Sequence, residues 1–220
     1  MKHLLRSILI ILTGFFVIIQ VTAQDQRVHT YMQAVSGQFK MDEDYIIELE
    51  TIREDIMRET RIEGEGTLWM RGLKYKMVVD EYIVYFDGER LYSQNTDTEE
   101  VYVSTPDPDD PGYMQAVPMK AIKGYQQDFR YQFMGEKPFM GRERVEIQLY
   151  PKELSGPYSM LKLYIHPQTL KLEAIVLMHK EGIHYTLILA SVRGNQKLDD
   201  GTFRFEQEKF PGTEVIELLD

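Results

Sequence analysis

Two histidines have a spacing that could serve metal chemistry. His179 and His184 flank Glu181-Gly182, a dipeptide typical of a tight turn, so their side chains could be neighbours on one face of a hairpin. A zinc site in a protein takes three or four ligands, and no third ligand lies at a workable spacing from this pair. Cross-strand histidines are also commonly surface residues. We therefore expect neither a metal site nor a cofactor.

The acidic and hydroxyl residues fit no catalytic pattern. Acidic clusters at 42–44 and 99–100 fall on expected turns or strand faces, and the stretch 107–112 lacks the closing Glu of a calcium loop. Neither Ser93 nor Ser191 stands on the Gly-x-Ser-x-Gly turn that exposes a nucleophile. The sequence therefore favours a binding protein over an enzyme.

The elements around these residues are mainly strands. After a helical pattern over residues 26–39, apolar side chains recur at every second position, and Asp87-Gly88 predicts a hairpin between two aromatic-rich runs. This alternation continues to Phe203 and Phe205, giving about ten strands with few helices, as in a large antiparallel sheet. Gly64 and Gly66 inside one run are typical of a bulge or bend.

The first 23 residues have the order of a secretory signal. Lys2 and Arg6 precede an apolar run over residues 8–19, and Val21-Thr22-Ala23 supplies small residues for cleavage. An uncleaved membrane anchor is the competing interpretation, because the run approaches the length of a spanning helix. The cleavage site and the polar sequence after it favour removal of residues 1–23, which leaves residues 24–220 as one domain.

The rest of the composition limits the possible partners. The chain has no cysteine, which excludes disulfides and a lipid-carrying N-terminal cysteine. Its net charge of −10 repels phosphates, so we expect no nucleic-acid partner. Twelve methionines, fourteen tyrosines and ten phenylalanines suit a large adaptable cavity, although an ordinary aromatic-rich β core would have the same composition.

Three motifs resemble a known family. They are Gly66-Thr67-Leu68-Trp69-Met70-Arg71, then Asp87-Gly88-Glu89-Arg90-Leu91-Tyr92, and near the end Phe203-Arg204-Phe205 followed by Pro211-Gly212. Their order and spacing resemble the LolA family of periplasmic lipoprotein carriers. Arg71 matches the functional Arg of that family only through a gap, because Gly72 stands where the family has Pro, and Tyr92 replaces a Trp.

The resemblance implies both a fold and a role. The fold would be a single large, curved antiparallel sheet that forms an incomplete, half-open β-barrel covered by a few helices. The role would be to escort the acyl chains of lipoproteins through the periplasm as a monomer. An inner-membrane lipoprotein-releasing transporter would load it, with or without a separate outer-membrane acceptor. The alternative is a same-fold lipid or lipoprotein sensor for envelope assembly.

An acyl carrier needs an apolar lining, and strand alternation predicts which residues supply it. A shift of one residue in strand parity would exchange this lining for its neighbours, Trp69 among them. We expect a lid made of the helix at 26–39 and the segment 114–125, with movement allowed by the loop 106–112. The predicted lining residues are Leu68, Met70, Leu73, Tyr75, Met77, Tyr85, Tyr92, Phe129, Tyr131 and Phe133.

Overall fold

The computed structural model describes residues 26–107 and 118–218. The expected signal segment 1–23, most of the expected loop 106–112 and the first residues of the expected helical segment 114–125 lie outside these ranges. Among the described residues, no helix has the length and apolar character that crossing a membrane requires.

A single sheet contains all twelve strands of the described residues, which confirms the mainly β fold. Along the sheet the order is β12-β6-β5-β4-β3-β2-β1-β11-β10-β9-β8-β7, and only the β12–β6 pair is parallel. The strands are β1 (Asp44–Asp55), β2 (Thr60–Arg71), β3 (Lys74–Val79), β4 (Tyr82–Phe86), β5 (Leu91–Asn95), β6 (Glu100–Ser104), β7 (Phe129–Phe139), β8 (Arg142–Pro151), β9 (Tyr158–Ile165), β10 (Leu172–His179), β11 (Ile183–Gln196) and β12 (Glu214–Glu217).

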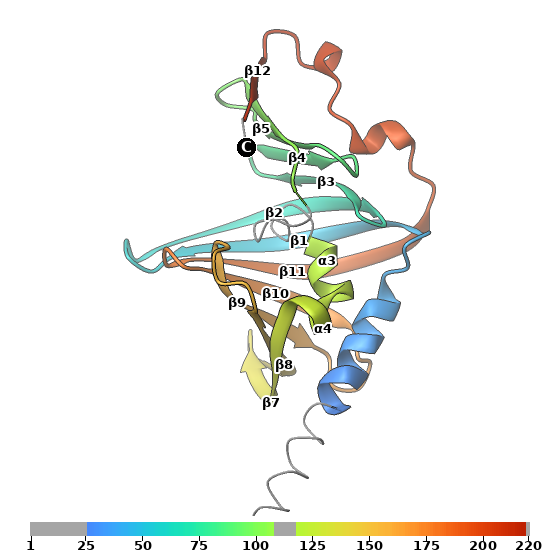
Figure 1. Cartoon of the computed structure of the whole chain (residues 1–220), viewed down its shortest axis with the longest axis vertical. Helices are drawn as coiled ribbons and strands as arrows, with labels where there is room; N and C mark the ends of the chain where they lie inside the picture. The colour runs from blue at the N-terminus through green and yellow to red at the C-terminus, as the bar shows by residue number, and fades with distance from the viewer. Residues whose placement is uncertain (1–25, 108–117, 219–220) are drawn as a thin grey trace, which may run out of the picture.

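The sheet curves strongly but does not close. Its two edges, β7 and β12, are not paired with each other, so the strands form an open half-barrel (Figure 1). Strand β1 lies near the middle and pairs along its whole length with β2 and β11. Its alternate residues Tyr45, Ile47 and Leu49 are at most 4% exposed, because they face the helical side of the sheet.

Helices cover this inner face of the sheet. They are the helix at residues 26–38, α3 (Pro118–Lys123) and α4 (Tyr125–Asp128). In the helix at 26–38, Val28, Met32 and Val35 recur at helical spacing and are fully buried in the core. The amphipathic pattern therefore predicts this helix correctly.

Polar contacts join the helix at 26–38 to the segment that contains α3 and α4. Lys123 Nζ donates to the carbonyl oxygens of Ser36 at 2.6 Å and Phe39 at 2.7 Å, at the C-terminal end of the helix at 26–38. His29 Nδ1 lies 2.9 Å from the Tyr125 hydroxyl oxygen. Cations at a helix C-terminus complement its dipole, so α3 and the helix at 26–38 form one connected cover.

The chain after β11 runs over the outer face of the sheet. The expected strand at Phe203 and Phe205 is wrong, because Asp200–Phe203 forms the short 3-10 helix η1 instead. Phe205 then stacks on Tyr92 with ring centroids 5.6 Å apart, and η2 (Gln207–Lys209) leads into β12. Aromatic packing, rather than strand pairing, fixes this part of the segment.

Candidate functional site

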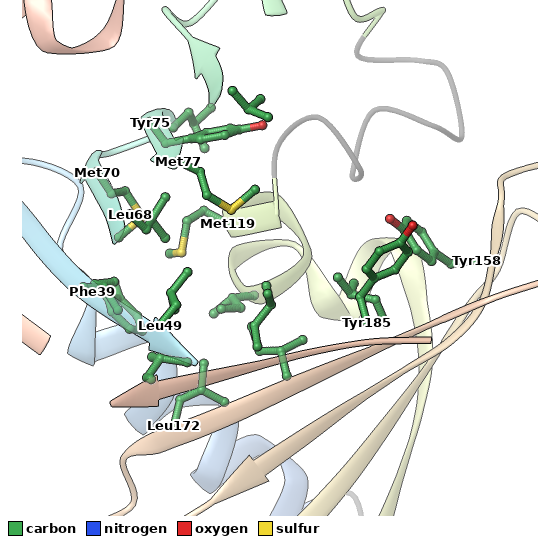
Figure 2. Close-up of a pocket in the computed structure, with 18 of the residues that line it drawn as sticks. Phe39, Leu49, Leu68, Met70, Tyr75, Met77, Met119, Tyr158, Leu172 and Tyr185 are labelled. Carbon is green, nitrogen blue, oxygen red and sulfur yellow. The ribbon is translucent and has the colours of Figure 1, made fainter. Parts of the chain in front are cut away.

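A cavity of about 490 Å³ lies between the curved sheet and its helical cover. Its walls come from β1–β5 on one side and from β9–β11 on the other, and Phe39, Met119 and Ile122 close it from the helical side (Figure 2). Segments more than a hundred residues apart in the sequence therefore share one lining. The volume falls within the range of about 300–1,000 Å³ that is usual for small-molecule sites.

Aliphatic, thioether and aromatic side chains dominate the lining. Met70, Met77 and Met119 extend into the cavity from β2, β3 and α3 (Figure 2). The thioether is flexible and polarisable, so methionines can adjust to ligands of different shape. Further lining residues are Ile47, Leu49, Leu68, Leu73, Val84, Leu91, Leu172, Ile175, Leu177, Ile183, Leu187 and Leu189.

Polar groups in the lining are few, and most are neutral. Burial raises the pKa of the Tyr75 hydroxyl above its ordinary range, with a smaller contribution from Tyr158. Burial and, to a smaller extent, Tyr185 raise the pKa of Tyr158 to about 12. The Glu181 side chain is 77% exposed, so it lies at the solvent edge rather than in the interior. Such a site suits an uncharged chain better than an ion.

Five of the predicted lining residues line this cavity. Leu68 and Met70 on β2, Leu73 in the following turn, and Tyr75 and Met77 on β3 all point into it. The intervening Trp69 lies on the outer face, where Lys76 Nζ stands 5.4 Å from the centre of its ring.

Tyr85 and Tyr92 do not line the cavity. They pair directly across β4 and β5 and contact Phe205 on the outer face, while Val84, Leu91 and Ser93 occupy the inner one. On β4 and β5, the residues that face the cavity are therefore the neighbours of the predicted ones.

Phe129, Tyr131 and Phe133 also lie outside the lining. Phe129 is 1% exposed, Tyr131 packs 5.5 Å from the Tyr125 ring, and Phe133 packs 5.9 Å from the Tyr31 ring. These residues are on the inner face, as parity predicts, but helices pack directly on β7 and separate them from this cavity. They anchor the cover to the sheet. Tyr131 borders a second hollow with Arg130, Gln132 and Tyr150.

Arg71 does not line the cavity but forms ion pairs and hydrogen bonds at the end of the sheet. Its guanidinium donates to both carboxylate oxygens of Asp44, to the Asp200 carboxylate and to the Leu198 carbonyl. The same group stands 5.5 Å from the centre of the Phe203 ring. These contacts use most of its donors to fix the segment after β11 against β1 and β2.

The two candidate metal-binding histidines face opposite sides of the sheet. His184 pairs with Met178, so His179, one residue further along β10, points to the other face and into the cavity. No group of three potential metal ligands occurs within residues 26–107 and 118–218.

Several lining residues were not predicted from the sequence. Ile175, Leu177, Tyr185, Leu187 and Leu189 come from β10 and β11. Their two-residue alternation could have identified them, because it shows which residues share one face of each strand. Only the tertiary pairing of β11 with β1 brings that face opposite β2 and β3.

The fold and its covered apolar cavity define a class of half-barrel binding protein. The family model described as outer membrane lipoprotein carrier protein LolA matches residues 57–206, more than half of the chain. The chain therefore belongs to the LolA family. A comparison with curated protein sequences finds no match.

Solved structures are similar to this one at low sequence identity. An uncharacterized conserved protein from Thermus thermophilus is 7% identical, with a TM-score of 0.53, and the match covers 87% of this chain and 99% of that one. A LolA superfamily protein from Nitrosomonas europaea is 8% identical, with a TM-score of 0.44 and coverage of 80% and 97%. A DUF1329 family protein from Desulfovibrio piger is 12% identical, with a TM-score of 0.47 and coverage of 83% and 98%.

Proposed function

We propose that this protein binds the acyl chains of lipoproteins in the cavity and carries them through the periplasm from the inner to the outer membrane. The observation that supports this most strongly is the covered apolar cavity, built on the fold of a lipoprotein-carrier family. Each methylene moved from water into such a site contributes about 0.8 kcal/mol, so a long acyl chain is strongly disfavoured in water. It leaves a membrane readily only when a protein cavity shields it.

The proposal extends to export and to partners. Residues 1–23 direct the chain to the periplasm and are removed, so the mass of the exported protein should correspond to a start near Gln24. The protein acts as a monomer, receives acylated lipoproteins from an inner-membrane transporter and releases them at an outer-membrane acceptor. It is a binding protein and not an enzyme, because its lining offers mainly alkyl, thioether and aromatic surface.

A charge placed in the cavity wall tests the proposal. Leu68→Lys puts an ammonium group on the apolar face of β2, whereas Thr67→Lys puts the same group on the outer face beside Glu48. We expect Leu68→Lys to weaken binding of a fluorescent fatty-acid probe by about tenfold or more, because the charge loses hydration there. Thr67→Lys should bind the probe like the wild type.

Equal probe binding by the two variants would contradict the cavity assignment. Transfer of a bound lipoprotein to outer-membrane vesicles then distinguishes a carrier from a sensor of the same fold. A carrier releases its cargo to the vesicles, whereas a sensor retains the cargo and copurifies with a regulatory protein.

A further inference from the structure

We infer that the cavity has a polar end, where the hydroxyl groups of Tyr158 and Tyr185 bind the carbonyl oxygen of an acyl ester. The alkyl chain then lies with its methyl end toward Phe39 and Leu49. This inference rests on the proposed function and adds to it the chemical class and the orientation of the ligand.

Two tyrosines meet at one end of the cavity from separate strands. Tyr158 on β9 and Tyr185 on β11 flank the β10 strand, and their hydroxyl groups lie close together in Figure 2. Tyr185 also contributes to the raised pKa of Tyr158, as expected of close neighbours. Two hydroxyl donors therefore meet at one end of a mainly apolar lining.

These hydroxyl groups have no partner among the described residues. No hydrogen bond links either of the two to residues 26–107 or 118–218. The Tyr158 ring is instead held by its edge-to-face contact with His179, at 5.7 Å between centroids and 83° between planes. A fixed ring with an unused donor is preorganised for a ligand acceptor.

The two ends of the cavity differ in polarity and exposure. At the tyrosine end, His179 and the exposed Glu181 lead to solvent. At the other end, Phe39, Leu49 and Leu172 are at most 4% exposed and present no polar side chain (Figure 2). An amphipathic ligand satisfies both ends only when its carbonyl lies at the tyrosines and its alkyl chain extends inward.

A pair of lipids that differ only in the carbonyl tests this assignment. Palmitoyl glycerol has an ester carbonyl, and hexadecyl glycerol is the ether that lacks it. One neutral hydrogen bond changes affinity by roughly twofold to tenfold, so we expect the wild type to prefer the ester by about that factor or more. The double variant Tyr158→Phe and Tyr185→Phe should bind both lipids with the affinity that the wild type has for the ether.

Tyr85→Phe is the matched control, because Tyr85 lies on the outer face against Phe205 and should leave the ester preference unchanged. Ether binding by the double variant shows that its cavity remains intact. Equal binding of ester and ether by the wild type, or a preference that survives in the double variant, overturns the inference and leaves the proposed function standing. Failure of the wild type to bind either lipid overturns both.

Discussion

Asp44 holds the segment after β11 against the sheet through charged hydrogen bonds. Its carboxylate accepts from Arg71 Nη2 at 2.8 Å and from the backbone N–H of Leu198 at 2.7 Å, and the residue is 7% exposed. The hydrogen bonds from Arg71 lower the pKa of Asp44, and the Leu198 amide adds to this against the cost of burial. The ionised carboxylate is therefore stabilised by folding.

We predict that Asp44→Asn lowers the free energy of unfolding by about 1.5–3 kcal/mol near neutral pH, as expected for hydrogen bonds to a charged group. A carboxyl whose folded-state pKa is depressed stabilises the fold above its unfolded pKa of about 3.9. This stability is lost as the pH falls through the lower folded-state pKa. Urea unfolding of wild type and variant should show the difference shrinking below about pH 4.

The exposed pair between Arg61 and Glu63 supplies the control. Glu63 has a side chain 69% exposed, so Glu63→Gln should change the free energy of unfolding by less than about 1 kcal/mol at any of these pH values. A stability difference between wild type and Asp44→Asn that did not vary with pH would contradict the role assigned to this ion pair.

The paired strands β2 and β3 approach each other closely at Gly66. A Cβ there would lie 2.5 Å from the Val78 carbonyl oxygen and 2.6 Å from Val79 Cγ2. The sequence predicts a bulge or a bend at Gly64 and Gly66. The register of β2 with both β1 and β3 is continuous, so no bulge forms there. The glycine serves close backbone packing on the strand that carries Leu68 and Met70.

We predict that Gly66→Ala lowers the free energy of unfolding by about 1–3 kcal/mol, because overpacking must displace the backbone of β3. Gly37→Ala should instead raise it by about 0.5–1 kcal/mol, since Gly37 lies on the exposed side of the helix at 26–38 and a Cβ there meets nothing within 4 Å. Chemical denaturation measures both. The same sign of change for the two substitutions would contradict this account of β2 packing.

Local alternation predicts the strands well and their inward faces only in part. On β2 and β3 polar neighbours identify the outer face, so Leu68 and Met77 could be assigned to the cavity. In β4, the run Tyr82-Ile83-Val84-Tyr85-Phe86 is apolar at both parities, and the pattern alone does not separate the faces. Phe205 covers Tyr85 from the outside, a contact between residues far apart in the sequence.

The cavity itself is a property of the whole molecule. It depends on β11 pairing with β1, which places the β9–β11 wall opposite the β1–β5 wall. Periodicity in the sequence predicts neither this pairing nor the space that the helices leave uncovered. Phe129, Tyr131 and Phe133 illustrate the limit, because they face inward as expected but pack against helices outside this cavity. The family motifs identify the fold because they depend on the order of the elements.

The most direct test of the central claim is to locate a bound acyl chain. A photoreactive diazirine side chain is placed at position 77, which lines the cavity, or at position 76, where Lys76 lies over the rings of Trp69 and Tyr85 on the outer face. After irradiation with palmitoyl glycerol, mass spectrometry should find the lipid attached at position 77 and not at position 76. Equal labelling at both positions, or none at position 77, would contradict the claim that this cavity holds the acyl chain.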